Sequence, residues 1–73
     1  MLNELDVVKL VEDLPDHGIR AGQVGTIVHI HTRPNVAYEV EFADDDGETL
    51  AMVTLLESQI NVSWRMPQVL KAA

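Results

Sequence analysis

Residues 36–55 contain two segments of apolar and polar residues that a turn signal separates, and this pattern restricts the chain to an antiparallel β-fold. In VAYEVEF (residues 36–42) every second residue is large and apolar, and the residues between them are Ala, Glu and Glu. This is the pattern of a strand with one wet face. Asp46-Gly47 is a dipeptide favoured in tight hairpin turns, where both central residues take positive φ. We therefore predict that ETLAMVTL (residues 48–55) pairs antiparallel with residues 36–42.

Shorter apolar segments predict the remaining strands. Two segments are rich in β-branched residues and predict strands, namely LDVVKLV (residues 5–11) and VGTIVHIH (24–31). We also predict one 3₁₀ turn over LESQI (56–60), followed by a last short strand over NVSW (61–64). Five short strands, tight turns and a long first loop predict an all-β fold, namely a small five-stranded SH3-like barrel in which a bent sheet closes on itself.

Length and composition predict one domain. The chain has 73 residues and no Cys, so only apolar packing, and a partner, can stabilise it. We expect a barrel over residues 1–64 and a C-terminal tail over residues 65–73. No apolar run approaches the roughly 18 residues of a membrane span, and the first residues are acidic where a signal peptide is basic. We expect a cytoplasmic protein that binds no membrane.

Charge narrows the choice of partner. Twelve Asp and Glu against five Lys and Arg give a net charge of −7, which repels phosphate backbones. Nucleic acid is therefore not an expected ligand. All the acids lie within residues 1–60, whereas residues 61–73 contain only Arg65 and Lys71 as charged residues, so the acidic body and basic tail can differ in role.

The first loop carries the most suggestive residues. Residues 14–28 read LPDHGIRAGQVGTIV. We predict that Pro15 and Gly18 shape an outer turn, Asp16 accepts backbone N–H bonds within it, Gly22 lets the chain re-enter the sheet, and Gly25 permits a close backbone approach or a bulge.

Two chemistries compete with this structural interpretation of the loop. Asp16 and His17 could form an acid/base pair, although adjacent loop residues usually point apart and no nucleophile is near. Gly22 and Gly25 have a G-x-x-G spacing that could cradle a phosphate, but a strand and not a helix N-terminus follows them. We therefore expect no catalytic residues and no enzyme activity.

A metal site is the third possibility. Strict alternation puts His29 and His31 on one strand face with Ile27, where they could bind zinc or nickel weakly with His17 or a carboxylate. The alternative is an exposed strand face, and we expect no cofactor. Asp44, Asp45 and Asp46 lack calcium-loop spacing, because Gly47 comes too early.

Several motifs together resemble a known family. LPDHG, then G-x-V-G-T-I-V, AYEVEF and DGET occur in order over about residues 5–60, and this combination is similar to the small prokaryotic family called domain of unknown function 4926. The resemblance implies an SH3-like barrel of unestablished biochemistry, toxin-like gene neighbours for some members, and no catalytic residues. AGQVGTIV also resembles KOW modules and the nitrile hydratase β-subunit barrel, without their basic surface or metal ligands.

The remaining features are candidates for partner binding. Asp44, Asp45 and Asp46 form a docking loop for a basic protein. Trp64, beside Arg65, either anchors a partner or plugs the core at the barrel end.

Three functions follow from these features. We favour a non-catalytic acidic protein-interaction module, with an antitoxin or immunity role against a toxin-like protein as its specific form. The alternatives are a structural protein that self-associates through strand edges or its tail, and a small metal-binding accessory subunit.

Overall fold

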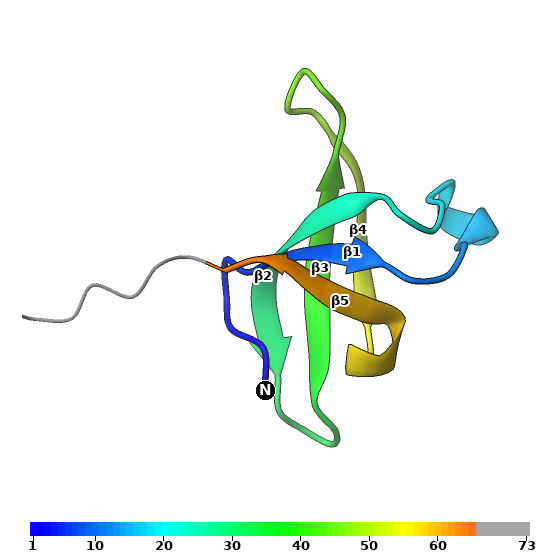
Figure 1. Cartoon of the computed structure of the whole chain (residues 1–73). Helices are drawn as coiled ribbons and strands as arrows, with labels where there is room; N and C mark the ends of the chain where they lie inside the picture. The colour runs from blue at the N-terminus through cyan, green and yellow to red at the C-terminus, as the bar shows by residue number, and fades with distance from the viewer. Residues whose placement is uncertain (66–73) are drawn as a thin grey trace, which may run out of the picture.

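The computed structural model describes residues 1–65, which fold into one five-stranded antiparallel sheet (Figure 1). The elements are β1 (Val7–Leu10), η1 (Pro15–His17), β2 (Val24–His31), β3 (Ala37–Ala43), β4 (Thr49–Leu55), η2 (Glu57–Gln59) and β5 (Ile60–Trp64), where η denotes a 3₁₀ helix. The predicted all-β class, the five strands and the 3₁₀ turn before the last strand are confirmed. The predicted tail lies, beyond Arg65, outside the described residues.

The sheet is open, so the predicted closed barrel is wrong. The strands follow the order β4-β3-β2-β1-β5, which leaves β4 and β5 as edges that are not hydrogen-bonded to each other. After η2, β5 runs along β1: the Val11 N–H donates to the Gln59 carbonyl at 2.9 Å, and Leu10 pairs with Ile60. The other edge of β5 is not paired with β4. In Figure 1, β1 and β5 run across β3 and β4, so the sheet curls without closing.

The concave side of this curl holds the core. Tyr38, Val40 and Phe42 are completely buried, which confirms the predicted inward face of β3, while Val36 precedes the strand and is exposed. Apolar residues from every strand, the N-terminal segment and the first loop complete the core. They are Leu2, Val8, Leu10, Ile19, Ile27, Val53, Leu55 and Ile60.

A bulge in β2 changes which residues face this core. Ile27 pairs with Val40, but His29 and not Val28 pairs with Glu39, so the register shifts between Ile27 and His29. One extra residue in a strand reverses the alternation beyond it. Ile30 therefore packs against the core, and the prediction that Ile27 and His29 share one strand face is wrong.

The first loop folds against its own backbone. Pro15 begins η1, and Gly18 ends it in the left-handed conformation while its N–H donates to the Pro15 carbonyl. The Gly22 N–H donates to the Leu10 carbonyl at 2.7 Å, so this N–H is not free to bind a phosphate. Ile19 is buried and joins the loop to the core.

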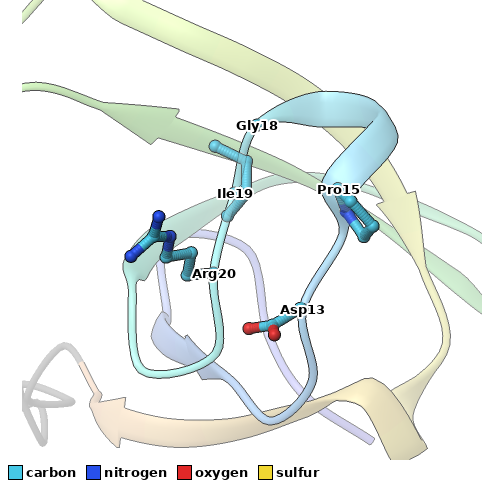
Figure 2. A pocket seen from close by; sticks show the side chains of 5 residues that line it. All are labelled: Asp13, Pro15, Gly18, Ile19 and Arg20. Atoms are coloured by element: carbon cyan, nitrogen blue, oxygen red, sulfur yellow. The ribbon is translucent and has the colours of Figure 1, made fainter.

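A carboxylate accepts a backbone N–H bond within this loop, but it belongs to Asp13 and not to Asp16 as predicted. Asp13 Oδ1 accepts a hydrogen bond from the Ala21 N–H at 2.8 Å, whereas the carboxylate of Asp16 is exposed in η1 and has no hydrogen bond within residues 1–65. A pocket of about 330 Å³ lies inside the loop (Figure 2). Its lining residues are Asp13, Pro15, Gly18, Ile19 and Arg20.

Gly25 lets β2 approach β3 closely, as predicted. A β-carbon at this position would lie 2.6 Å from Cγ1 of Val40 and 2.9 Å from the Glu41 carbonyl oxygen. Real Cβ atoms do not come this near to a backbone oxygen, so any side chain at position 25 would push the two central strands apart.

Gly25→Ala is therefore expected to lower the free energy of unfolding by about 1–3 kcal/mol, the usual cost of overpacking a filled core. Denaturant titration followed by circular dichroism measures this. Thr32→Ala, in the exposed β2–β3 loop, is the control and should change stability by less than about 0.5 kcal/mol. Equal stability of Gly25→Ala and the wild type would contradict the close packing of β2 on β3.

Candidate interaction surface

The convex side of the sheet points away from the core, and we call it the outer face. Cross-strand pairing aligns one residue from each strand in a row across it. From β4 to β5 the row is Met52, Glu41, Thr26, Val7 and Trp64. Three of these five side chains are apolar, so the outer face is not a uniformly solvated surface.

Trp64 ends this row because β5 pairs with β1 irregularly. Val62 pairs with Val8, whose side chain is buried, but Trp64 pairs with Val7, so the register shifts by one residue. Without that shift, alternation would turn Trp64 to the same side as Val8. The Trp64 residue is 50% exposed, so the interpretation of Trp64 as a core plug is wrong.

A polar cluster lies beside the row. Glu39 accepts hydrogen bonds from His31 Nε2 at 2.8 Å and from the Thr54 hydroxyl at 3.1 Å. These bonds, the one from His31 foremost, hold the pKa of the Glu39 carboxyl below its usual value. Glu39 is therefore a fixed negative charge on the outer face at neutral pH.

The two histidines of the metal-site alternative, His29 and His31, lie in or next to this cluster. The rings of His29 and His31 meet edge to face with centroids 4.7 Å apart. They share the outer face, although the bulge in β2 and not strict alternation places them there. Within residues 1–65, no group of three His, Asp or Glu side chains is arranged to hold a metal ion.

The acidic hairpin loop differs from the predicted tight turn. Gly47 alone takes a positive φ, 83°, and its N–H donates to the Asp44 carbonyl at 3.0 Å, while the Asp44 N–H donates to the Glu48 carbonyl at 2.9 Å. Asp45 and Asp46 thus form the centre of a three-residue turn that Gly47 closes, the type I turn with a following left-handed residue. The chain contains one residue more in this turn than the Asp46-Gly47 hairpin allows.

The three aspartates of this loop have different roles. Asp44 Oδ1 accepts hydrogen bonds from the N–H groups of Asp46 and Glu48, both at 2.9 Å, so its carboxylate organises the loop. Asp45 and Asp46 are exposed. Only these two present carboxylates whose contacts are with solvent, and they are the loop's candidates for partner binding.

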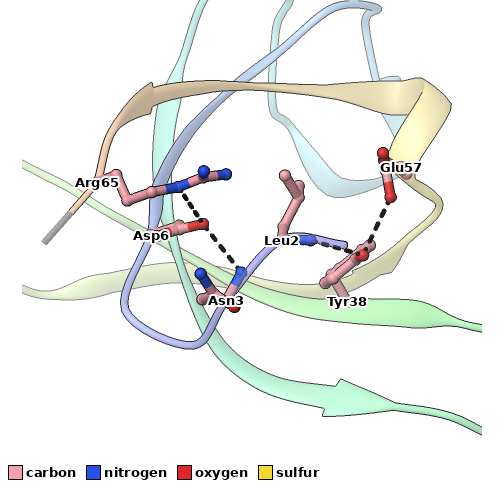
Figure 3. A network of polar contacts seen from close by, with 6 residues as sticks. All are labelled: Leu2, Asn3, Asp6, Tyr38, Glu57 and Arg65. Carbon is pink, nitrogen blue, oxygen red and sulfur yellow. Dashed lines mark hydrogen bonds and ion pairs between the residues drawn. The ribbon is translucent and has the colours of Figure 1, made fainter. Parts of the chain in front are cut away.

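Arg65 is part of a polar network at the end of β5 (Figure 3). Its Nε lies 3.3 Å from Oδ2 of Asp6, which is buried and also accepts the Asn3 N–H at 2.9 Å. A buried carboxylate without a cation costs several kcal/mol. The predicted partner-binding Arg65 therefore has a structural contact, while half of its side chain is exposed.

Tyr38 forms the other part of this network. Its hydroxyl accepts the Leu2 N–H at 3.1 Å and donates to Glu57 Oε1 at 3.1 Å. Burial raises the pKa of this hydroxyl, so the donor proton is retained. Tyr38 thus joins the N-terminal segment and η2 to the central strand.

Sequence reasoning missed most of the row on the outer face. Val7 and Met52 lie in no quoted motif, Thr26 was noted only as part of G-x-V-G-T-I-V, and the alternation of TLAMVTL gave the one signal for Met52. Asp6 was missed as well, because a carboxylate beside an apolar strand reads as an exposed residue. The acid/base alternative is not assembled, since Asp16 and His17 are exposed and share no hydrogen bond in the described part of the chain.

The fold and the outer face define a small all-β protein with an open sheet. The chain belongs to the family described as domain of unknown function (DUF4926), whose sequence profile matches residues 4–62. No curated protein and no solved structure matches the chain. In the part of the chain that the structure describes, no helix is long and apolar enough to cross a membrane.

Asp44→Ala is expected to lower the free energy of unfolding by about 1–2 kcal/mol, because two backbone N–H groups lose their acceptor. Asp45→Ala removes the same charge from the same loop and is the control, with a change below about 0.5 kcal/mol. Thermal unfolding of both variants measures the difference. Equal effects of the two substitutions would show that Asp44 does not organise the turn.

Proposed function

We propose that this chain is a non-catalytic protein-binding module whose outer face contacts a basic partner protein. The observation that carries the proposal is the row across all five strands, in which Trp64 is half exposed at one end and Met52 at the other. Exposed aromatic residues on rigid elements are typical interface anchors. The row supplies apolar contact area of that kind on strands and not on loops.

Charge supports a basic partner. Glu41 presents a carboxylate within the row and Glu39 one beside it, and Asp45 and Asp46 add two more from the hairpin loop. With the net charge of −7, this surface attracts a Lys- or Arg-rich protein and raises its association rate, which falls as salt screens the charges.

The residue inventory supports binding and not catalysis. The chain has no Cys, and Ser58 and Ser63 lie outside any nucleophile-elbow pattern. Asp6, Asp13, Asp44 and Tyr38 each make hydrogen bonds or an ion pair that hold the fold together.

A toxin-like protein is the specific partner that we place first. The resemblance of this chain to its family implies toxin-like gene neighbours for some members, and a basic toxin would complement the acidic outer face. In this form of the proposal the chain acts in the cytoplasm as an antitoxin or immunity protein, and binding blocks the partner's own functional surface.

The test is affinity capture with the tagged chain from lysate of its native cells, followed by mass spectrometry at low and high salt. We expect a stoichiometric basic protein that high salt releases. Trp64→Ala should weaken its binding about 30-fold, since an anchor residue contributes 2 kcal/mol or more.

Val36→Ala is the matched control, because Val36 is exposed but lies before β3 and away from the row. It should bind like the wild type. Capture of an acidic partner, or a captured protein whose affinity is the same for Trp64→Ala and Val36→Ala, would contradict the proposed use of the outer face.

A further inference from the structure

In the part of the chain that the structure describes, strand β4 is an edge with little of the usual protection. Among residues 1–65 it is hydrogen-bonded to β3 alone. Its seven residues, Thr49–Leu55, include no charged residue and no Pro, although the chain contains twelve Asp and Glu. Natural edge strands are normally interrupted by Lys, Pro or a bulge, or covered by another element, because free backbone groups pair with other strands.

The irregularity that β4 does have lies at its beginning. The register shifts between Phe42 and Ala43, whereas the pairing from Ala51 to Leu55 is regular. At this edge Leu50 is 52% and Met52 49% exposed. A straight, uncharged and partly apolar strand segment is therefore open to pairing on its far side.

We propose that β4 pairs antiparallel with β4 of a second copy of this chain, around a two-fold axis at Met52. In this register Met52 lies opposite Met52 of the other copy, and Ala51 lies opposite Val53. Leu50 then lies opposite Thr54. The five pairs from Leu50 to Thr54 are uncharged and most match a larger side chain with a smaller one, so this part of the strand is complementary to itself, as an isologous interface requires.

Charge favours a second copy over a basic partner at this edge. The strand carries no charge to pair with Lys or Arg, and the carboxylates nearest to it, Glu39 and Glu41, are one strand further in and accept hydrogen bonds from Thr54 and Thr49. Glu41 residues of the two copies would be three strand spacings apart, about 14 Å, which exceeds the Debye length of about 8 Å at physiological salt. The two acidic hairpin loops would lie at opposite ends of the paired strands.

The dimer and the proposed binding of a basic partner can be separated experimentally. Salt weakens the contact between opposite charges but screens the repulsion between two acidic chains, so the dimer should persist or strengthen at high salt. The dimer contact includes Met52 at one end of the row on the outer face, whereas Trp64 lies at the other end of the row, on β5. Trp64→Ala therefore tests partner binding without changing the β4 edge, and either proposal can fail without the other.

The first experiment measures the molar mass of the full chain by sedimentation equilibrium over a concentration series at low and high salt. We expect a concentration-dependent mass of two chains that high salt maintains. Met52→Lys places a charge in the centre of the edge and should give one chain, whereas Val11→Lys, with similar exposure but at the end of β1, should remain dimeric. A single-chain mass for the wild type up to its solubility limit overturns the proposal.

A second experiment covers the case in which Met52→Lys does not fold. Because the chain has no Cys, Met52→Cys and Val62→Cys each introduce one thiol, at the β4 edge and the β5 edge respectively. A short bis-maleimide should cross-link Met52→Cys into dimers and leave Val62→Cys uncross-linked. Cross-linking of Val62→Cys alone would assign the interface to β5, and cross-linking of neither variant would overturn the dimer.

Discussion

The two-sided pattern of β3 is the constraint on which the rest of the structure depends. Tyr38, Val40 and Phe42 are completely buried on one side of this strand, and Glu39 and Glu41 lie on the other. A one-residue slip would bury the carboxylates and expose the aromatic rings, so the register of β3 with β2 and β4 is fixed. Tyr38 adds hydrogen bonds to Leu2 and Glu57, which extend this order to the N-terminal segment and η2.

Two register shifts then decide which residues reach the outer face. The bulge after Ile27 turns His29 and His31 outward beside Glu39, and the shift between Val7 and Val8 turns Trp64 outward. The first shift lies in β2, the middle strand of the sheet, and the second lies between β1 and β5 on one side of it. The candidate interaction surface is therefore a product of small irregularities added to a regular core, as is common where a strand presents a side chain for binding.

The sequence predicted the parts of the fold that local pattern controls. Alternation identified β3 and its inward face, and the bounds of β2 were predicted as observed. The bulges at Val28 and Ser63 were not predictable, because no Gly or Pro stands at either position. Each extra residue is recognised only by comparison with the neighbouring strand, whose residues are distant in sequence. Barrel closure was predicted from five short strands, tight turns, a long first loop and a 3₁₀ turn before the last strand, but none of these features shows whether the edge strands β4 and β5 pair with each other. The role of Asp44 in organising the hairpin loop could have been predicted from the sequence, because Asp is favoured at the first position of a type I turn.

The sheet is open, with β3 inside it and β4 at its edge. Residue-resolved hydrogen exchange of the backbone amides shows which strands are interior and which lie at an edge. In dilute solution, where sedimentation shows single chains, we predict slow exchange for all amides of β3 and fast exchange for every second amide of β4, with those β4 amides becoming protected at higher concentration. Slow exchange of all β4 amides in the single chain would contradict the account, because it would mean that the sheet closes on itself.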